Sequence, residues 1–219
     1  VMFNSWGADM APASPSLSLR VGAEQPEGFD QMEAIGSVVA EAVHASIDEL
    51  EWQTEPEISL ATHRVPINRD VIGYDDDTFP YEYGGLYCEA EGDCVAGTTI
   101  DDLDKKCLPF NADHPAPIQT VMTAGQLGPM HLMTFPGEPG TLLAEQVIDD
   151  LRAAHSGVDQ VLFLGYTQDY LGYSILEDDW WEGGYEASGA LWGPRQGEYL
   201  AGRAVDVFDA AVTGGSLSD

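Results

Sequence analysis

The stretch MHLMTFPGEPGTLLAEQVIDDLRAAHSGVDQVLFLGY, residues 130–166, shows the alternation of element types on which the fold class depends. Its apolar beginning predicts the second strand of a hairpin over residues 117–135, with the turn at 125–129. A helix is predicted over 140–155, and residues 161–165 have the pattern of a short, fully apolar strand. The predicted apolar face of that helix consists of Leu142, Leu143, Val147, Ile148 and Leu151.

Further elements alternate on both sides of this segment. Residues 1–6 predict a buried strand, 57–67 a strand with β-branched residues, and 196–212 a last helix. Asp30 predicts the start of another helix, with Glu33 completing a capping box. Its apolar positions recur at three- and four-residue steps: Met32, Ile35, Val39, Val43, Ile47 and Leu50. The order strand, helix, strand, hairpin, helix, strand, helix predicts a mixed, layered α/β fold.

Residues 68–116 have no clear periodicity and predict an irregular insertion, which we expect to form a lid or an interface. The run Asp75-Asp76-Asp77 lacks the ligand spacing of an EF-hand, so a solvated loop is favoured over a calcium site. Three cysteines, Cys88, Cys94 and Cys107, lie in the same region. Their crowding suggests one local disulfide with the third cysteine free or bonded to another chain, and hence a secreted or periplasmic protein.

The composition is strongly acidic. Asp and Glu number 38 against 8 Lys and Arg, which gives a formal net charge of -30. Such a surface repels the phosphates of nucleic acids and anionic membranes, so neither is an expected partner. The charge fits a highly solvated surface, or alternatively a surface that binds cations. The sequence has no run of 18 apolar residues, so we expect no transmembrane segment.

Two segments contain residues that suit chemistry. Pro136-Gly137-Glu138 follows an apolar strand and precedes a helix, a common position for a functional carboxylate in α/β proteins. Residues 166–194 also follow an apolar strand and are rich in Tyr, Trp, Gly and acidic residues. Each segment also has an ordinary explanation, since Glu138 favours the helix dipole and an aromatic cluster packs well.

Taken together, these segments resemble the neutral or alkaline non-lysosomal ceramidases. The likeness lies in the PGE of 136–138 after the strand QLGPMHLMTF, and in Tyr170 and Tyr173 followed by Tyr185-Glu186-Ala187 and Trp192-Gly193-Pro194. A weaker likeness lies in NSWGADMAP, residues 4–12. The resemblance implies that residues 1–219 are the C-terminal portion of a ceramidase-like catalytic domain, with 68–116 as an insertion.

The resemblance also implies a zinc-dependent hydrolase of amide bonds in N-acyl, ceramide-like substrates. In that family two His, one Glu and one Tyr hold the zinc, and the matching residues here are Glu138 and Tyr173. Tyr185 matches a tyrosine that assists at the developing oxyanion, and Tyr170 is expected at the substrate. Asp9 matches the carboxylate of the family's loop, where it would orient the loop or act as a general base; orientation is favoured.

Two departures from the family pattern matter. Ala11 stands at the substrate-side position where the family has a serine, so zinc-activated water is the expected nucleophile. The histidine ligands of the family lie upstream of the loop that matches residues 4–12, and His44, His63, His114, His131 and His155 have no matching position. We therefore expect an upstream chain of the same precursor to supply two histidines, and the predicted buried strand at Val1 suggests proteolytic processing.

Two other functions remain open from the sequence. One is a metal-dependent esterase or amidase that acts on soluble, non-lipid substrates. The other is a non-catalytic binding subunit that retains the fold, which Ala11 and the unmatched histidines favour.

Overall fold

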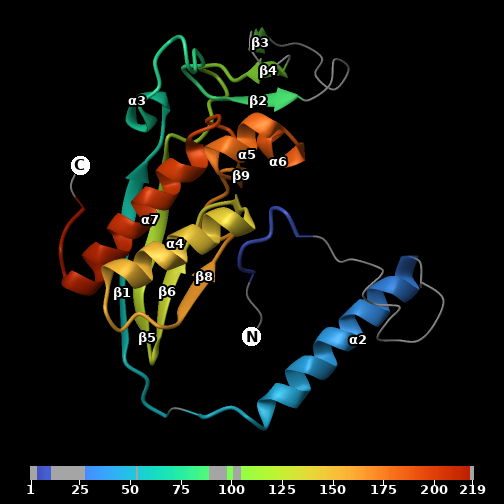
Figure 1. Cartoon of the computed structure of the whole chain (residues 1–219), viewed down its shortest axis with the longest axis vertical. Helices are drawn as coiled ribbons and strands as arrows, with labels where there is room; N and C mark the ends of the chain where they lie inside the picture. The colour runs from blue at the N-terminus through green and yellow to red at the C-terminus, as the bar shows by residue number, and fades with distance from the viewer. Residues whose placement is uncertain (1–3, 11–27, 53, 89–97, 101–104, 218–219) are drawn as a thin grey trace. The chain divides into compact units, whose positions relative to one another are not determined.

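The computed structural model describes residues 4–10, 28–52, 54–88, 98–100 and 105–217. It divides into two compact units, one of Val1–Asp9 with Pro56–Asp219 and one of Met10–Glu55. The second unit contains helix α2, Gly28–Ile47 (Figure 1). This helix begins two residues before the expected cap, so Asp30 lies in its first turn, and it ends before Leu50. Over the described ranges, every helix is too short or too polar to traverse a lipid bilayer.

A four-stranded mixed sheet is the centre of the larger unit, which confirms the predicted α/β fold class. Its order is β1-β5-β6-β8; the β1–β5 and β5–β6 pairs are antiparallel, and β6–β8 is parallel. The parallel pair requires a crossover, and α4 (Thr141–Ala154) lies in that connection. The strands are Ile58–Pro66, Gln119–Leu127, Met130–Thr134 and Val161–Leu164.

Two local predictions about strands were wrong. The hairpin turn is only Gly128-Pro129, because Gly125 lies inside β5 and pairs with Leu60 on one side and Leu132 on the other. Asn4, Ser5 and Trp6, the described part of the predicted N-terminal strand, are not in a strand.

Helices α4 and α7 (Gln196–Thr213) cover one face of the sheet (Figure 1). The apolar face predicted for α4 is correct except for Leu142, which is 56% exposed, while Ala144 is fully buried. Successive helical residues point about 100° apart, so Leu142 turns away from the stripe that Leu143 begins. The core between the helices and the sheet includes Met122, Met133, Phe163, Leu143, Val147, Leu151, Leu200, Ala204 and Phe208.

Residues 68–116 are less irregular than expected. They contain a short helix and a three-stranded antiparallel sheet of order β2-β4-β3. Asp75 and Asp76 are exposed, one bonded to the Thr78 amide and the other paired with Arg69, which confirms an exposed loop there. The elements are α3 (Arg69–Ile72), β2 (Gly85–Cys88), β3 (Thr98–Ile100) and β4 (Lys105–Pro109).

The predicted disulfide lies outside the described residues. Cys88 and Cys107 lie on the neighbouring strands β2 and β4, but their side chains, like all of Cys94, are not part of the description. The disulfide therefore stays a prediction.

A two-stranded parallel pair lies where β6 and β8 end. Strand β7 (Glu138–Pro139) follows β6 after three residues, and β9 (Tyr173–Ser174) follows the loop after β8. Two short helices, α5 (Glu177–Glu182) and α6 (Tyr185–Ser188), come next in the chain. Residues 136–138 and the tyrosine-rich segment that contains Tyr173 thus meet beyond the carboxyl ends of the parallel strands.

Candidate functional site

Glu138 and Tyr173 are direct partners in the parallel β7–β9 pair. The pairing is fixed by two backbone bonds, from the Glu138 amide to the Gly172 carbonyl and from the Gly140 amide to the Ser174 carbonyl, both 2.9 Å. Functional side chains of α/β proteins commonly gather outside the carboxyl ends of parallel strands. The two residues that the sequence predicted as a pair are therefore placed side by side by the fold.

The backbone before Tyr173 passes through a tight space. Gly172 has a φ of 73°, and a Cβ there would lie 2.0 Å from the Gly189 carbonyl oxygen. The Tyr173 amide donates to the same carbonyl at 3.2 Å. A Cβ on Gly189 would in turn lie 2.5 Å from the Tyr173 ring. The ring of Tyr173 is thus packed directly on the Gly189 backbone, which fixes its orientation.

The carboxylate of Glu138 accepts hydrogen bonds from two tyrosines. Tyr166 donates its hydroxyl to Oε2 at 3.0 Å, and Tyr170 donates to Oε1. The hydrogen bond to Glu138 is the main cause that raises the pKa of Tyr170 to about 12. Burial, followed by the bond to Glu138, raises the pKa of Tyr166 to about 12. Tyr170 was expected at the substrate, and the structure puts its hydroxyl on Glu138.

Tyr185 lies against Tyr173. Their ring centroids are 5.4 Å apart at an interplanar angle of 70°, an edge-to-face contact. Burial, a hydrogen bond with Tyr185 and the negative charge of Glu138 together raise the pKa of Tyr173. Tyr185 is the first residue of α6 and is 69% exposed, so a bound molecule could contact it. Four predicted residues, Glu138, Tyr170, Tyr173 and Tyr185, are therefore gathered in one place.

Asp9 lies beside the same strand pair but is occupied by structural bonds. Its Oδ1 accepts from the amide of Thr141 at 3.0 Å and from the hydroxyl of Thr141 at 2.9 Å, which caps the first turn of α4. The amides of Gly7 and Ala8 donate to the Pro139 carbonyl at 3.2 and 3.3 Å. These bonds fit the orienting role of Asp9. Ala11, the other predicted residue of this loop, lies outside the described residues.

Two contributors to the site were missed from the sequence. Tyr166 belongs to the aromatic stretch after β8, but nothing in the pattern separated it from the other tyrosines. Gln196 is fully buried at the start of α7, where its amide donates to the carbonyls of Leu171 and Tyr173 at 2.9 and 2.8 Å. A polar residue in a first helical turn is usually solvated, so the sequence carried no signal for this role.

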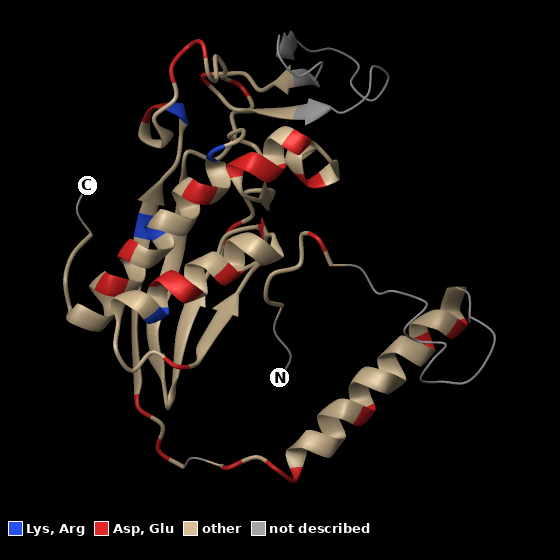
Figure 2. Cartoon of the chain, viewed as in Figure 1, with Lys and Arg blue, Asp and Glu red and all other residues tan. Residues whose placement is uncertain are grey.

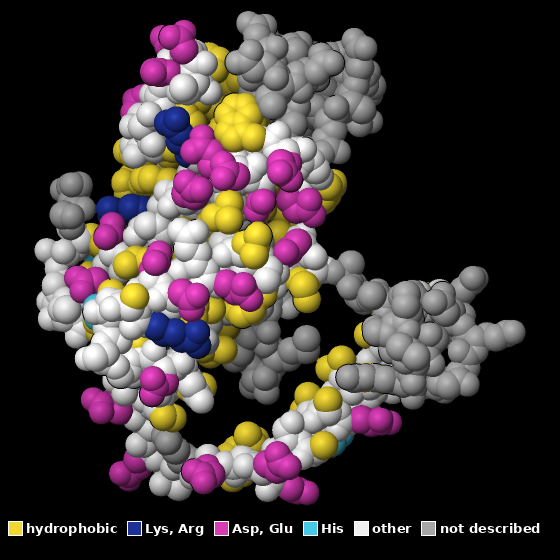
Figure 3. Space-filling model, viewed as in Figure 1, with side chains coloured by type: hydrophobic (Ala, Val, Ile, Leu, Met, Phe, Trp, Pro, Cys, Tyr) yellow, Lys and Arg dark blue, Asp and Glu magenta, His cyan; other side chains and the backbone are white. Residues whose placement is uncertain are grey.

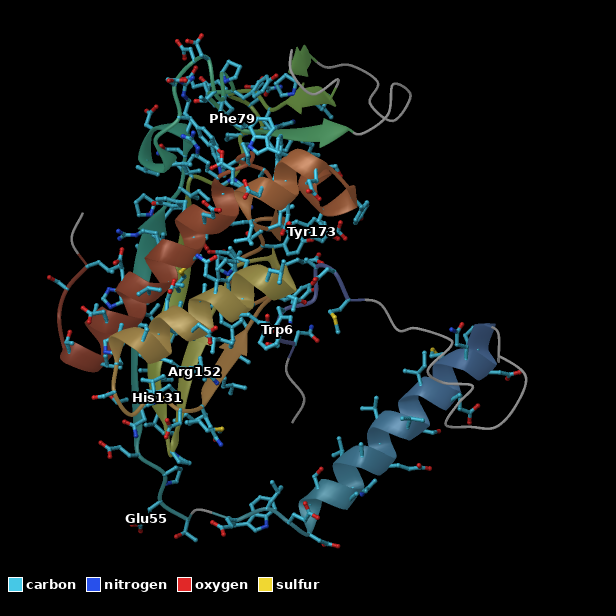
Figure 4. The ribbon with its side chains drawn as sticks, in the orientation of Figure 1. Trp6, Glu55, Phe79, His131, Arg152 and Tyr173 are labelled. Atoms are coloured by element: carbon cyan, nitrogen blue, oxygen red, sulfur yellow. The ribbon has the colours of Figure 1, made fainter. Side chains whose placement is uncertain are left out.

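His131 and His155 do not lie beside Glu138. His131 pairs with Val161 at the start of β8, and His155 follows the far end of α4. Figure 4 shows His131 and Tyr173 toward opposite ends of the sheet region. No three His, Cys, Asp or Glu side chains among the described residues are grouped so that they could hold a metal. The oxygen donors available at this place are Glu138 and the neighbouring tyrosines.

The surroundings of the site are acidic. Figure 2 shows Asp and Glu on α4, α5 and α7 with few Lys or Arg between them, and Figure 3 shows the acidic side chains scattered over the visible face. A pocket of about 190 Å³ lies beside Thr141 and includes the carboxylates of Asp9, Asp179 and Glu186 in its lining. Such surroundings favour cations over anions near the site.

Comparison with known proteins is informative at the level of structure. No family model and no curated protein matches the chain. Among solved structures, neutral ceramidase from Pseudomonas aeruginosa matches 91% of this chain with a TM-score of 0.62 and 18% identity. This chain has the fold of a part of neutral ceramidase. A ceramidase complexed with C2 matches 87% of the chain with a TM-score of 0.62 and 15% identity.

The ceramidase likeness has a defined extent. The matches cover 36% and 35% of the ceramidase chains, so this chain spans about a third of their length. The resemblance noted from the sequence is confirmed at the level of fold, over nearly the whole of this chain.

Proposed function

We propose that the chain is part of a zinc-dependent hydrolase of amide bonds in N-acyl, ceramide-like substrates, in which Glu138 and Tyr173 are two of the zinc ligands. The observation that carries the proposal is the direct β7–β9 pairing of these two residues within a ceramidase-like fold. The likeness to ceramidases supports a hydrolase of amides, and the gathered tyrosines support the assignment of this region as the active site.

The residues present fit half of a zinc site. A carboxylate is an ordinary zinc ligand, and zinc in proteins takes about four ligands. Burial, a hydrogen bond with Tyr185 and the negative charge of Glu138 raise the pKa of the Tyr173 hydroxyl. A divalent cation beside this hydroxyl would oppose the effect and favour coordination. Two more donors are needed, and we propose two histidines from an upstream segment of the same precursor.

The residues of this chain would have different roles in amide hydrolysis. When bound, zinc supplies a Lewis acid that polarises the amide carbonyl or activates a water. The hydroxyl of Tyr185, an exposed residue, would donate to the oxygen that gains charge in the tetrahedral transition state. Ala11 has no hydroxyl, so water is the nucleophile. Asp9 would hold the loop of residues 4–9 against α4, and the exposed Tyr170 would contact the substrate.

Zinc content of the full-length protein tests the proposal. Wild type should bind zinc, Glu138→Ala should lose it, and Glu145→Ala should retain it, because Glu145 is an exposed residue of α4 with the same charge. Unchanged zinc in Glu138→Ala would reject the assignment.

Release of fatty acid from ceramide, compared with cleavage of short N-acyl and ester substrates, separates this function from an esterase or amidase that acts on soluble substrates.

A second candidate is a non-catalytic binding subunit. The position of His131 and His155 away from Glu138 favours it, since neither of these histidines reaches the site. This function predicts that the full-length protein with its upstream sequence hydrolyses none of these substrates. Turnover that disappears in Tyr185→Phe would exclude it.

The remaining expectations concern the setting of the protein. We propose a secreted or periplasmic, proteolytically processed protein that works on small-molecule or lipid amides and does not bind nucleic acid. The net charge of -30 and the clustered cysteines support this setting.

A further inference from the structure

Tyr166 has a backbone conformation that is unusual for its residue type. Its φ is 56°, in the left-handed region, and Gln168 two residues later has a φ of 69°. Non-glycine residues adopt this region at an energetic cost, and such positions persist when the surrounding structure holds them. The Tyr166 amide donates to the Gly137 carbonyl at 2.8 Å. The backbone of Tyr166 is thus bonded to the residue that immediately precedes Glu138.

The hydroxyl of Tyr166 lies between Glu138 and Gly7. It donates to Glu138 Oε2 at 3.0 Å. A Cβ on Gly7 would lie 2.6 Å from the Tyr166 hydroxyl oxygen and 3.4 Å from the ring. Gly7 is itself held by its bond to the Pro139 carbonyl. The absence of a side chain at Gly7 is therefore what leaves room for this hydroxyl beside the carboxylate.

Tyr170 holds the other oxygen of Glu138 in a different setting. Its side chain is 56% exposed, against 37% for Tyr166. It donates to Oε1. The two oxygens of Glu138 therefore differ: one is held by a tyrosine whose hydroxyl packs against Gly7, and the other by a tyrosine that is more exposed.

We infer that Tyr166 is the positioning residue of Glu138: the Tyr166 hydroxyl holds Oε2 and leaves Oε1 for the metal ion. This inference rests on the proposed function. Carboxylates that bind metals are oriented by hydrogen bonds from neighbouring groups, and the loss of such a partner lowers metal affinity about 10- to 100-fold. The bond from Tyr170 to Oε1 competes with the ion for that oxygen.

Three substitutions distinguish the roles of Tyr166 and Tyr170 in metal binding. Tyr166→Phe should weaken Zn²⁺ binding about 10- to 100-fold. Tyr170→Phe should leave it unchanged or strengthen it, because the competing hydrogen bond is gone. Gly7→Ala should act like Tyr166→Phe because its methyl group displaces the hydroxyl, and it should add little in the Tyr166→Phe background.

The experiment is a Zn²⁺ titration of the full-length protein in competition with a chromogenic chelator. Glu138→Ala and Gly202→Ala serve as references, since a Cβ on Gly202 meets open space. Weaker binding in Tyr166→Phe and Gly7→Ala, but not in Tyr170→Phe or Gly202→Ala, supports the inference. Equal or greater weakening in Tyr170→Phe overturns it.

Other outcomes are equally decisive. If Glu138→Ala removes Zn²⁺ binding and Tyr166→Phe does not change it, the proposed function stands and the positioning role fails. If Glu138→Ala binds Zn²⁺ like wild type, the metal site itself is wrong. Additive effects of Gly7→Ala and Tyr166→Phe would also overturn the inference, because the glycine would then act through something other than the hydroxyl.

Discussion

Glu138 and Tyr173 lie opposite each other in a parallel pair of strands only two residues long. The strands are too short to be stabilised by their own bonds, so the pairing depends on the backbone around them. Gly172 supplies the carbonyl that accepts from the Glu138 amide, and it packs on the Gly189 carbonyl. The geometry of the candidate site is thus determined largely by main-chain contacts at glycine positions.

Substitution of Gly172 should disturb the site through the backbone. Alanine at a φ of 73° costs about 1–2 kcal/mol for the left-handed conformation, and its Cβ would overlap the Gly189 carbonyl. We expect Gly172→Ala to lower the free energy of unfolding by about 2 kcal/mol or more, measured by urea denaturation. Gly202→Ala, in α7 with open space around its Cβ, should raise stability by up to about 1 kcal/mol. Equal effects of the two substitutions would contradict this account.

Asp9 offers a test of its two roles. Asp9→Ala removes the acceptor that caps α4 and should cost about 1 kcal/mol of stability, whereas Asp9→Asn keeps an acceptor oxygen and should cost less. If Asp9 only orients the loop, Asp9→Asn should keep amide hydrolysis near the wild-type rate. A loss of 10²-fold or more in the folded Asn variant would instead indicate a general base. Asp150→Ala, at an exposed position of α4, should change stability by no more than about 0.5 kcal/mol.

The helices and strands were predictable because their periodicity is local. Residues of α4 repeat their burial every three or four positions, so the pattern located the helix without knowledge of the sheet. The pattern failed at Leu142, which sits at the edge of the apolar stripe and in the first turn, where hydrophobicity alone does not decide the direction. The prediction of an N-terminal strand was wrong for a different reason. Trp6 packs on Phe163 and the Ser5 hydroxyl donates to the Phe163 carbonyl, so these two residues contact β8 through their side chains and not as a paired strand.

The candidate site was only partly predictable. The resemblance identified Glu138 and Tyr173, but the partners that hold them come from distant segments. Gly7 and Tyr166 are far apart in the sequence and meet only in the fold. Gln196 lies in a helix that the sequence placed correctly, yet its burial depends on how that helix packs against β9. Such contacts leave no local pattern.

The charge of Glu138 should be visible in the titration of Tyr170. The bond to Glu138 is the main cause that raises the pKa of Tyr170 from 10 to about 12. The unfolded chain loses this proton at lower pH than the folded chain does. The free energy of unfolding should therefore be unaffected well below pH 10 and should fall as the pH rises from about 10 to about 12.

Glu138→Gln removes the charge and should move the pKa of Tyr170 toward its usual value. Tyrosinate absorbance should then rise at lower pH in the variant than in wild type, and the alkaline loss of stability should shrink. Glu145→Gln changes an exposed glutamate of α4 and should titrate like wild type. Superimposable curves for Glu138→Gln and wild type would mean that the carboxylate does not hold the Tyr170 hydroxyl in solution.

Gln196 links the core to the strand that carries Tyr173. Its side chain is fully buried, donates to the carbonyls of Leu171 and Tyr173, and accepts from the amide of Trp192 at 2.8 Å. Gln196→Leu would leave these groups without that partner, at about 1–3 kcal/mol for each one left unsatisfied, so we expect roughly 3 kcal/mol of lost stability in urea denaturation. Gln146→Leu, at an exposed position of α4, should change stability by no more than about 0.5 kcal/mol.

Gln196→Glu sharpens the same prediction. A carboxylate can still accept from the Trp192 amide, but it cannot donate to the carbonyls of Leu171 and Tyr173 unless it is protonated. The variant should therefore be destabilised at neutral pH and should regain part of the difference from wild type as the pH is lowered through the pKa of the new carboxyl. If Gln196→Glu is as stable as wild type at neutral pH, the donated bonds do not hold β9, and the position of Tyr173 must depend on the glycine contacts instead.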